Sequence, residues 1–133
     1  MMATKVKKKM DRAVSWFEIP AEKLSRAKKF YENILHITMT DMDMGDSLKM
    51  TIFPVKEGGV GGALCQNKKF YKPSAEGTLV YLPAEPDVQT ILDRVEENGG
   101  KIIQPRTQIS DEYGYMAVIQ DTEGNRVALH GMQ

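Results

Sequence analysis

A chain of 133 residues with 41% hydrophobic and 27% charged residues can form one domain with its own core, without disulfides or structural zinc. Its 18 basic and 18 acidic residues balance, which argues against the broad positive surface of a nucleic-acid-binding domain. No apolar run approaches the roughly 18 residues that a membrane-spanning helix needs. We therefore expect neither nucleic acid nor membrane as a partner.

The amino terminus and the cysteine content indicate the cellular compartment of the protein. Residues 1–12 are expected to form a flexible tail with the basic cluster Lys5, Lys7, Lys8 and Lys9. This cluster is typical of a solvated terminus, with an anionic partner as the alternative. The single cysteine, Cys65, excludes an internal disulfide, and no secretory apolar segment follows the tail. Together these features predict a reducing, cytoplasmic compartment.

The first half of the chain predicts a strand, a helix and three further strands. In order, these are a strand at 13–19, a helix at 22–33, a hairpin of 38–44 and 48–53, and a strand at 62–66. Pro20 ends the first strand, Asn33 is expected in the left-handed position after the helix, and Gly45-Asp46 forms the hairpin turn. The glycines of 58–62 lack the lysine of a phosphate loop and predict a mobile loop at the rim of a site.

The second half repeats this order. Its predicted elements are a strand at 78–82, a helix that has Pro86 in its first turn and its apolar stripe at 88–95, a strand at 101–104, and a hairpin of 113–120 and 125–130. Pro83 closes the first of these strands, and Asn98-Gly99-Gly100 ends the helix. An offset of about 64 residues carries Val14–Ile19 onto Thr78–Pro83 and two further elements onto their counterparts. We therefore expect one domain over 13–133, made of module 1 (about 13–66) and module 2 (about 77–130).

Four motifs in this order resemble a known superfamily. They are WFEIP at 16–20 leading into LSRAKKFY at 24–31, GTLVYL at 77–82, ENGG at 97–100, and DTEGN at 121–125. Their sequence and order resemble the glyoxalase, bleomycin-resistance and extradiol dioxygenase families, the vicinal oxygen chelate superfamily. The resemblance implies an α+β fold of two βαβββ modules that form a half-open barrel around a ligand, with helices on the outer face. It also implies a homodimer.

The same resemblance places metal ligands on the first and last strand of each module. In this chain those positions fall on Trp16, Ala63, Thr78 and Ala128. None of these side chains is a usual ligand of a transition metal. We therefore expect a member of the superfamily that has no metal and no other cofactor.

Alternation along the strands predicts the residues that line the cavity of the barrel. The predicted ligand-binding residues are Trp16, Met50, Ile52, Ala63, Cys65, Thr78, Val80, Met116, Val118 and Ala128. Such an apolar wall suits a small, mostly apolar or aromatic molecule. Trp16 either stacks on this ligand or fills the volume of the missing metal centre. Cys65 is expected to be structural.

Glu18 and His130 are the two groups on this wall that can transfer protons, and they are the candidate catalytic residues. Three functions follow from these expectations. The first is binding of a small molecule without a metal. The second is an enzyme, either a lyase or isomerase that uses Glu18 and His130, or a metal-dependent glyoxalase or dioxygenase. The third is a dimerisation module without a ligand.

Overall fold

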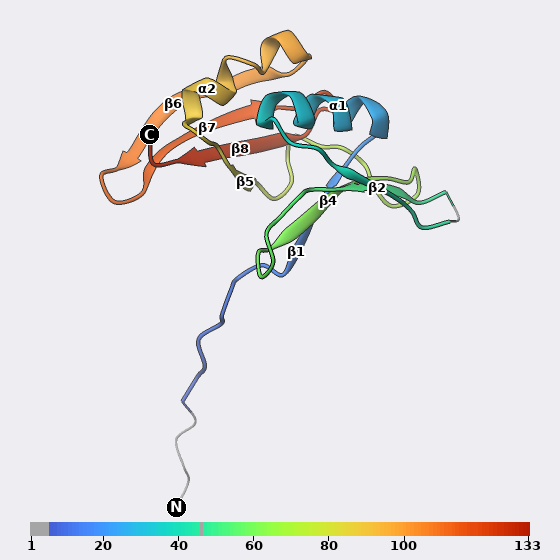
Figure 1. Cartoon of the computed structure of the whole chain (residues 1–133), viewed down its shortest axis with the longest axis horizontal. Coiled ribbons are helices and arrows are strands. Elements are labelled where there is room, and N and C mark those ends of the chain that lie inside the picture. The colour runs from blue at the N-terminus through green and yellow to red at the C-terminus, as the bar shows by residue number, and fades with distance from the viewer. Residues whose placement is uncertain (1–5, 46) are drawn as a thin grey trace, which may run out of the picture.

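The computed structural model describes residues 6–45 and 47–133. Lys5 of the basic cluster and Asp46 of the predicted hairpin turn lie outside these residues. Residues 6–15 contain no helix or strand and lead away from the domain (Figure 1). No helix in the described ranges has the length and apolar character to cross a membrane.

In the described residues, eight strands form two four-stranded sheets with the same topology. The first sheet has the order β1 (Trp16–Pro20), β4 (Gly61–Gln66), β3 (Lys49–Ile52), β2 (Thr40–Asp43). The second has the order β5 (Val80–Pro83), β8 (Arg126–Gly131), β7 (Gly114–Gln120), β6 (Lys101–Ser110). In each sheet the first and last strands of the module pair in parallel, and the other pairs are antiparallel. The predicted α+β fold of two βαβββ modules in a half-open barrel is therefore confirmed.

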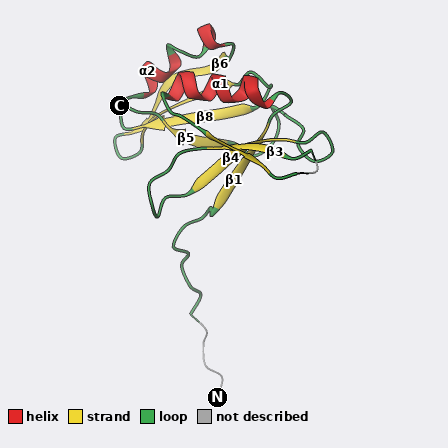
Figure 2. Ribbon diagram, turned by 45° about the vertical axis from the view of Figure 1, so that its right-hand side comes forward, coloured by secondary structure: helices red, strands yellow, loops and turns green. Residues whose placement is uncertain are grey.

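The helices lie side by side over the outer faces of the sheets (Figure 1, Figure 2). Helix α1 (Leu24–Leu35) runs two residues beyond the prediction, because the buried Ile34 continues its apolar stripe. His36, with φ of 53°, takes the left-handed position that was expected for Asn33. Helix α2 (Val88–Leu92) is short, and a 3₁₀ turn, η1 (Glu96–Asn98), follows it.

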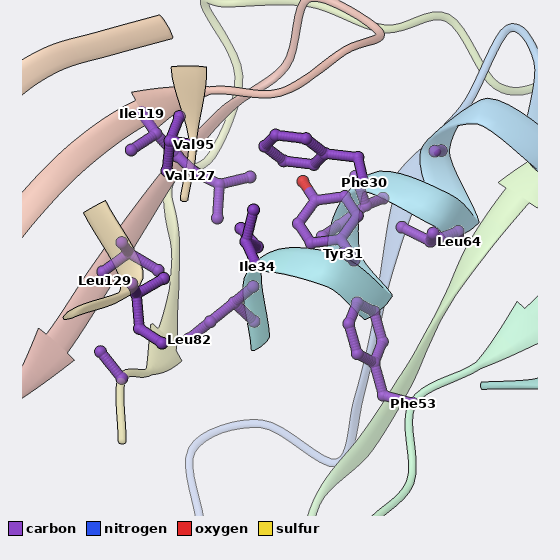
Figure 3. Packing of buried hydrophobic residues seen from close by; sticks show 14 of the residues in the cluster. Phe30, Tyr31, Ile34, Phe53, Leu64, Leu82, Val95, Ile119, Val127 and Leu129 are labelled. Atoms are coloured by element: carbon purple, nitrogen blue, oxygen red, sulfur yellow. The ribbon is translucent and has the colours of Figure 1, made fainter. Parts of the chain in front are cut away.

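One hydrophobic cluster joins the two modules. Phe30, Tyr31 and Ile34 of α1 lie between side chains of the first module, such as Phe53, and side chains of the second module, such as Val127 (Figure 3). The Tyr31 ring packs edge-on against Phe30 at 5.1 Å and against Phe53 at 5.8 Å between centroids. Each fully buried side chain of this size stabilises the fold by roughly 1.5–3 kcal/mol. The core therefore fixes how the two sheets sit relative to each other.

The turn between β7 and β8 of the second module forms hydrogen bonds and an ion pair with the start of α1 in the first module. Glu123 accepts hydrogen bonds from the backbone N–H groups of Glu22 and Lys23 and forms an ion pair with Arg26 at 2.7 Å. Asn125 donates to the backbone oxygen of Pro20 at 2.6 Å. The predicted DTEGN motif is thus a contact between the modules as well as a turn.

The register corrects the predicted offset between the modules. Glu18 pairs with Ala63, and Tyr81 pairs with Ala128. The offset is therefore 63 from β1 to β5 (81 − 18) and 65 from β4 to β8 (128 − 63). Because side chains alternate along a strand, an error of one residue reverses the face. The predicted inward position of Val80 is wrong, since Val80 packs against the main core, and Tyr81 shares the face of Ala128.

Strand β6 is longer than predicted, since it continues from Gln104 to Ser110. The extension includes Pro105, which lies in an edge strand, since β6 pairs with β7 alone. A proline is tolerated on such an edge, where its missing N–H costs no ladder hydrogen bond. The register between β6 and β7 shifts across this proline, in the interval from Gln104 to Thr107.

Candidate functional site

The face of each sheet that points away from the helices is called here its inner face. On the first sheet, the inner face carries a small buried cluster of Met50, Ala63 and Cys65. Leu48, Ile52 and Tyr71 pack around this cluster and are partly buried. The strand neighbour Leu64 faces the other way, into the main core. The cluster therefore forms an apolar floor that is separate from the core under the helices.

The Glu18 carboxylate lies at this floor between two aromatic side chains. The Trp16 indole N–H donates to one carboxylate oxygen at 3.2 Å, and the Tyr71 hydroxyl donates to the other at 2.6 Å. Trp16 and Glu18 share a face because they are two residues apart in β1. Tyr71 comes from the loop after β4, whose turn is closed by the Tyr71 N–H donating to the Asn67 backbone oxygen. We call Trp16, Glu18 and Tyr71 the carboxylate cluster.

Two neighbouring groups remain protonated beside this carboxylate. Burial, and then the negative charge of Glu18, raise the pKa of the Cys65 thiol to about 12. The hydrogen bond to Glu18, and then burial, raise the pKa of the Tyr71 hydroxyl. Cys65 is therefore a neutral part of the floor and no nucleophile at neutral pH, and Tyr71 remains a hydrogen-bond donor.

Glycines in β4 make room for the aromatic rings of β1. A Cβ atom on Gly61 would lie 3.1 Å from the Trp16 ring, on the inner face. A Cβ atom on Gly62 would lie 2.3 Å from the Phe17 ring, on the outer face. These two glycines belong to a paired strand, so this part of the glycine-rich stretch has a packing role that differs from the predicted mobile rim.

The inner face of the second sheet is also mostly apolar. Val118 and Ala128 are buried there, Met116 and His130 are partly buried, and Tyr81 is 50% exposed. His130 Nε2 lies 2.6 Å from the Tyr113 backbone oxygen. A carbonyl oxygen only accepts, so Nε2 carries the proton and Nδ1 is the acceptor in the neutral ring.

The predicted residues thus divide between the two inner faces. Trp16, Glu18, Met50, Ile52, Ala63 and Cys65 belong to the first sheet, and Met116, Val118, Ala128 and His130 belong to the second. In the described residues no hydrogen bond or ion pair joins Glu18 to His130. Thr78 is exposed and precedes β5. It lines a groove of about 330 Å³ together with Glu18, Pro20, Lys72 and Asn125.

Tyr71 and Tyr81 are the two residues of these faces that sequence reasoning missed. Tyr71 lies in a polar loop, next to the exposed Phe70. An aromatic residue in a polar loop is a signal for a tertiary contact, but the loop sequence does not show that Tyr71, and not Phe70, packs against the sheet. Tyr81 was missed because of the one-residue error in offset.

The residues present do not fit the divalent ion that the resemblance implies. At the positions aligned with metal ligands, Trp16, Ala63 and Ala128 carry an indole and two methyl groups. The corrected offset of 63 moves the fourth position from Thr78 to Leu79, whose apolar side chain is no metal ligand either. Over residues 6–45 and 47–133, no group of three or more His, Cys, Asp or Glu side chains could hold a metal ion. Zinc sites have at least three converging protein ligands, whether they are structural or catalytic.

Solved structures of low sequence identity share this fold. A glyoxalase/bleomycin resistance protein from Albidiferax ferrireducens has a TM-score of 0.66 at 15% identity, and the match covers 90% of this chain and 98% of that one. The trypanothione-dependent glyoxalase I of Leishmania major has a TM-score of 0.67 at 17% identity, with 92% and 88% covered. A mutant of glyoxalase I from Zea mays has a TM-score of 0.65 at 20% identity, with 88% of this chain but 45% of that chain covered.

No curated protein matches the sequence significantly. The family model described as "Glyoxalase/Bleomycin resistance protein/Dioxygenase superfamily" matches residues 13–129. This span contains all eight strands except the last two residues of β8, so both modules are included. The chain therefore belongs to the glyoxalase/bleomycin resistance protein/dioxygenase superfamily.

Proposed function

We propose that this chain binds a small, mostly apolar or aromatic molecule on the inner faces of its half-open barrel, without a metal ion. One observation carries the proposal: Glu18 is held by Trp16 and Tyr71 at an apolar floor on the inner face of the first sheet. An apolar wall with a few placed polar groups is the usual composition of a small-molecule site.

Binding is favoured over acid–base catalysis because the two candidate groups lie on different sheets and bond to different partners. A general acid and base that work together need a shared substrate position within hydrogen-bond reach of both. Here the Glu18 oxygens accept from Trp16 and Tyr71, and His130 donates to Tyr113. A lyase or isomerase reaction therefore needs a substrate long enough to reach from one sheet to the other.

We also propose that the protein acts as a cytoplasmic homodimer. The outer strands β2 and β6 expose apolar side chains, including Met42 at 44% and Ile103 at 57%. A second copy that covers such edges would protect them from other pairing. The buried, protonated Cys65 thiol suits a reducing compartment. Light scattering after size exclusion should give twice the chain mass of 15.0 kDa.

A thermal-shift screen tests the binding proposal. Protein treated with a chelator is heated with a panel of aromatic and aliphatic small molecules, and separately with Mn²⁺, Co²⁺, Ni²⁺ and Zn²⁺. We expect organic molecules to raise the melting temperature, because a ligand that binds only the folded state stabilises it. We expect the metal ions to leave it unchanged. Stabilisation by metal ions and by no organic molecule would show that the proposal is wrong.

A further inference from the structure

The Glu18 side chain is exposed, and no ion pair within 4.0 Å joins it to a cation in the described residues. The two ion pairs in the described part of the chain join Arg26 to Glu123 and Lys28 to Asp41. The partners of Glu18 are uncharged, since they are the Trp16 indole and the Tyr71 hydroxyl. Neutral donors orient a carboxylate but leave its charge in place. The carboxylate cluster therefore presents a fixed anionic group.

The surroundings of this carboxylate leave room for a further partner. An ionised carboxylate offers about four lone-pair positions, and the two hydrogen bonds use two of them. The floor beneath it consists of Met50, Ala63 and Cys65. Of these, only the Cys65 thiol, a weak donor, hydrogen-bonds to Glu18, so one position on the carboxylate stays open. Trp16 is 43% exposed, so part of its ring is open to a ligand. An indole ring attracts a cation more strongly than any other side-chain ring.

We propose that the ligand of this site carries an organic cation, of the ammonium type, that binds the Glu18 carboxylate beside the Trp16 ring. This inference rests on the proposed function, because it names the chemical class of the molecule bound there. Tyr71 holds the carboxylate toward the floor, so the cation lies next to an apolar surface. The rest of the ligand can then contact Met50 and Ile52 on the neighbouring strand.

Lys72 is the internal cation that would compete with such a ligand. It lines the same groove as Glu18, next in sequence to Tyr71, yet it forms no ion pair within 4.0 Å in the described structure. Its long side chain can reach toward the carboxylate only by losing conformational freedom. Removal of the Lys72 charge should therefore strengthen the binding of a cationic ligand.

Trp16 is the single tryptophan of the chain, so its fluorescence reports directly on the site. The three probes are benzyltrimethylammonium, benzyl alcohol and benzoate, which share a phenyl ring and differ in charge. We expect benzyltrimethylammonium to bind about tenfold more tightly than benzyl alcohol, with benzoate weakest. Glu18→Gln should cost the cation about tenfold in affinity and change benzyl alcohol by less than about twofold. Lys72→Gln should improve cation binding by roughly twofold to threefold.

Glu97→Gln, on the exposed turn η1, is the matched control and should leave all three titrations unchanged. Far-ultraviolet circular dichroism confirms that each variant is folded. If the three probes bind equally and Glu18→Gln has no effect, the cationic ligand is wrong while the binding site stands. If no probe changes the Trp16 fluorescence or the melting temperature, both the inference and the proposed function fail.

Discussion

The Tyr31 hydroxyl donates a hydrogen bond to Asp121 at 2.7 Å. Tyr31 belongs to α1 in the first module, and Asp121 begins the turn between β7 and β8 in the second. Both residues are buried. Burial, and then the charge of Asp121, raise the pKa of the Tyr31 hydroxyl, so it remains a donor. The contact therefore joins the modules at the place where their common core meets the turn.

Replacement of Tyr31 by phenylalanine should destabilise the protein by about 1–3 kcal/mol, because it removes a donor from a buried carboxylate and keeps the ring. Urea unfolding followed by circular dichroism measures the change. Tyr113→Phe is the control, since Tyr113 is 60% exposed and its loss should cost less than about 0.5 kcal/mol. Equal stability of the Tyr31 variant and the wild type would show that the contact does not hold the modules together.

Glu123 should make stability depend on pH. Burial acts to raise the pKa of its carboxyl, but the hydrogen bonds from Arg26 and the Lys23 backbone outweigh this effect and hold it below the ordinary value of 4.5. A carboxyl with a lowered pKa stabilises the folded state above its unfolded pKa, and this stability is lost as the pH falls through the folded value.

Glu123→Gln should therefore cost about 1–2 kcal/mol at pH 7. Its free energy of unfolding should also fall less steeply than that of the wild type as the pH is lowered from 5. Unfolding in urea at a series of pH values measures both effects, and Glu97→Gln is the control. Parallel pH profiles for the wild type and Glu123→Gln would contradict this role of Glu123.

Gly62→Ala should destabilise the fold by about 1–3 kcal/mol, because its methyl group would overlap the Phe17 ring between β4 and the main core. Gly77→Ala is the matched control, since a Cβ atom there meets nothing within 4 Å. Thermal unfolding of the two variants in parallel measures the difference. A Gly77 variant as unstable as the Gly62 variant would show that the close approach is not the cause.

Cys65 should react very slowly with Ellman's reagent in the folded protein. With a thiol pKa of about 12, roughly one molecule in ten thousand carries the thiolate near pH 8, and the side chain is buried. We expect one equivalent to react quickly in 6 M guanidinium chloride and the native rate to be at least about a hundredfold lower. Fast stoichiometric reaction of the native protein would indicate an activated cysteine.

The order of the elements in both modules could be predicted from the sequence, and the structure confirms it. The residues of the inner face could be predicted only in strands whose alternation was aligned correctly between the modules. The segments before and after the helix differ in length between the two modules. A single offset of about 64 therefore assigned Val80 to the wrong face of β5 and left Tyr81 out of the predicted site.

Other features depend on tertiary contacts that no periodicity encodes. The hydrogen bond from Tyr71 to Glu18 spans 53 residues of sequence, and a polar loop has no hydrophobic period that would reveal it. The extension of β6 past Pro105 depends on its place at the edge of the sheet. The roles of Glu18 and His130 in proton transfer remain predictions.

The most direct test of a metal-free ligand site is a titration of Trp16 fluorescence in protein from which metal has been removed by a chelator. We expect benzyltrimethylammonium to cause a saturable change in emission, with the same dissociation constant after Zn²⁺ or Mn²⁺ is added. A change that requires the metal ion would contradict the account, because the ion and not the carboxylate cluster would then create the site.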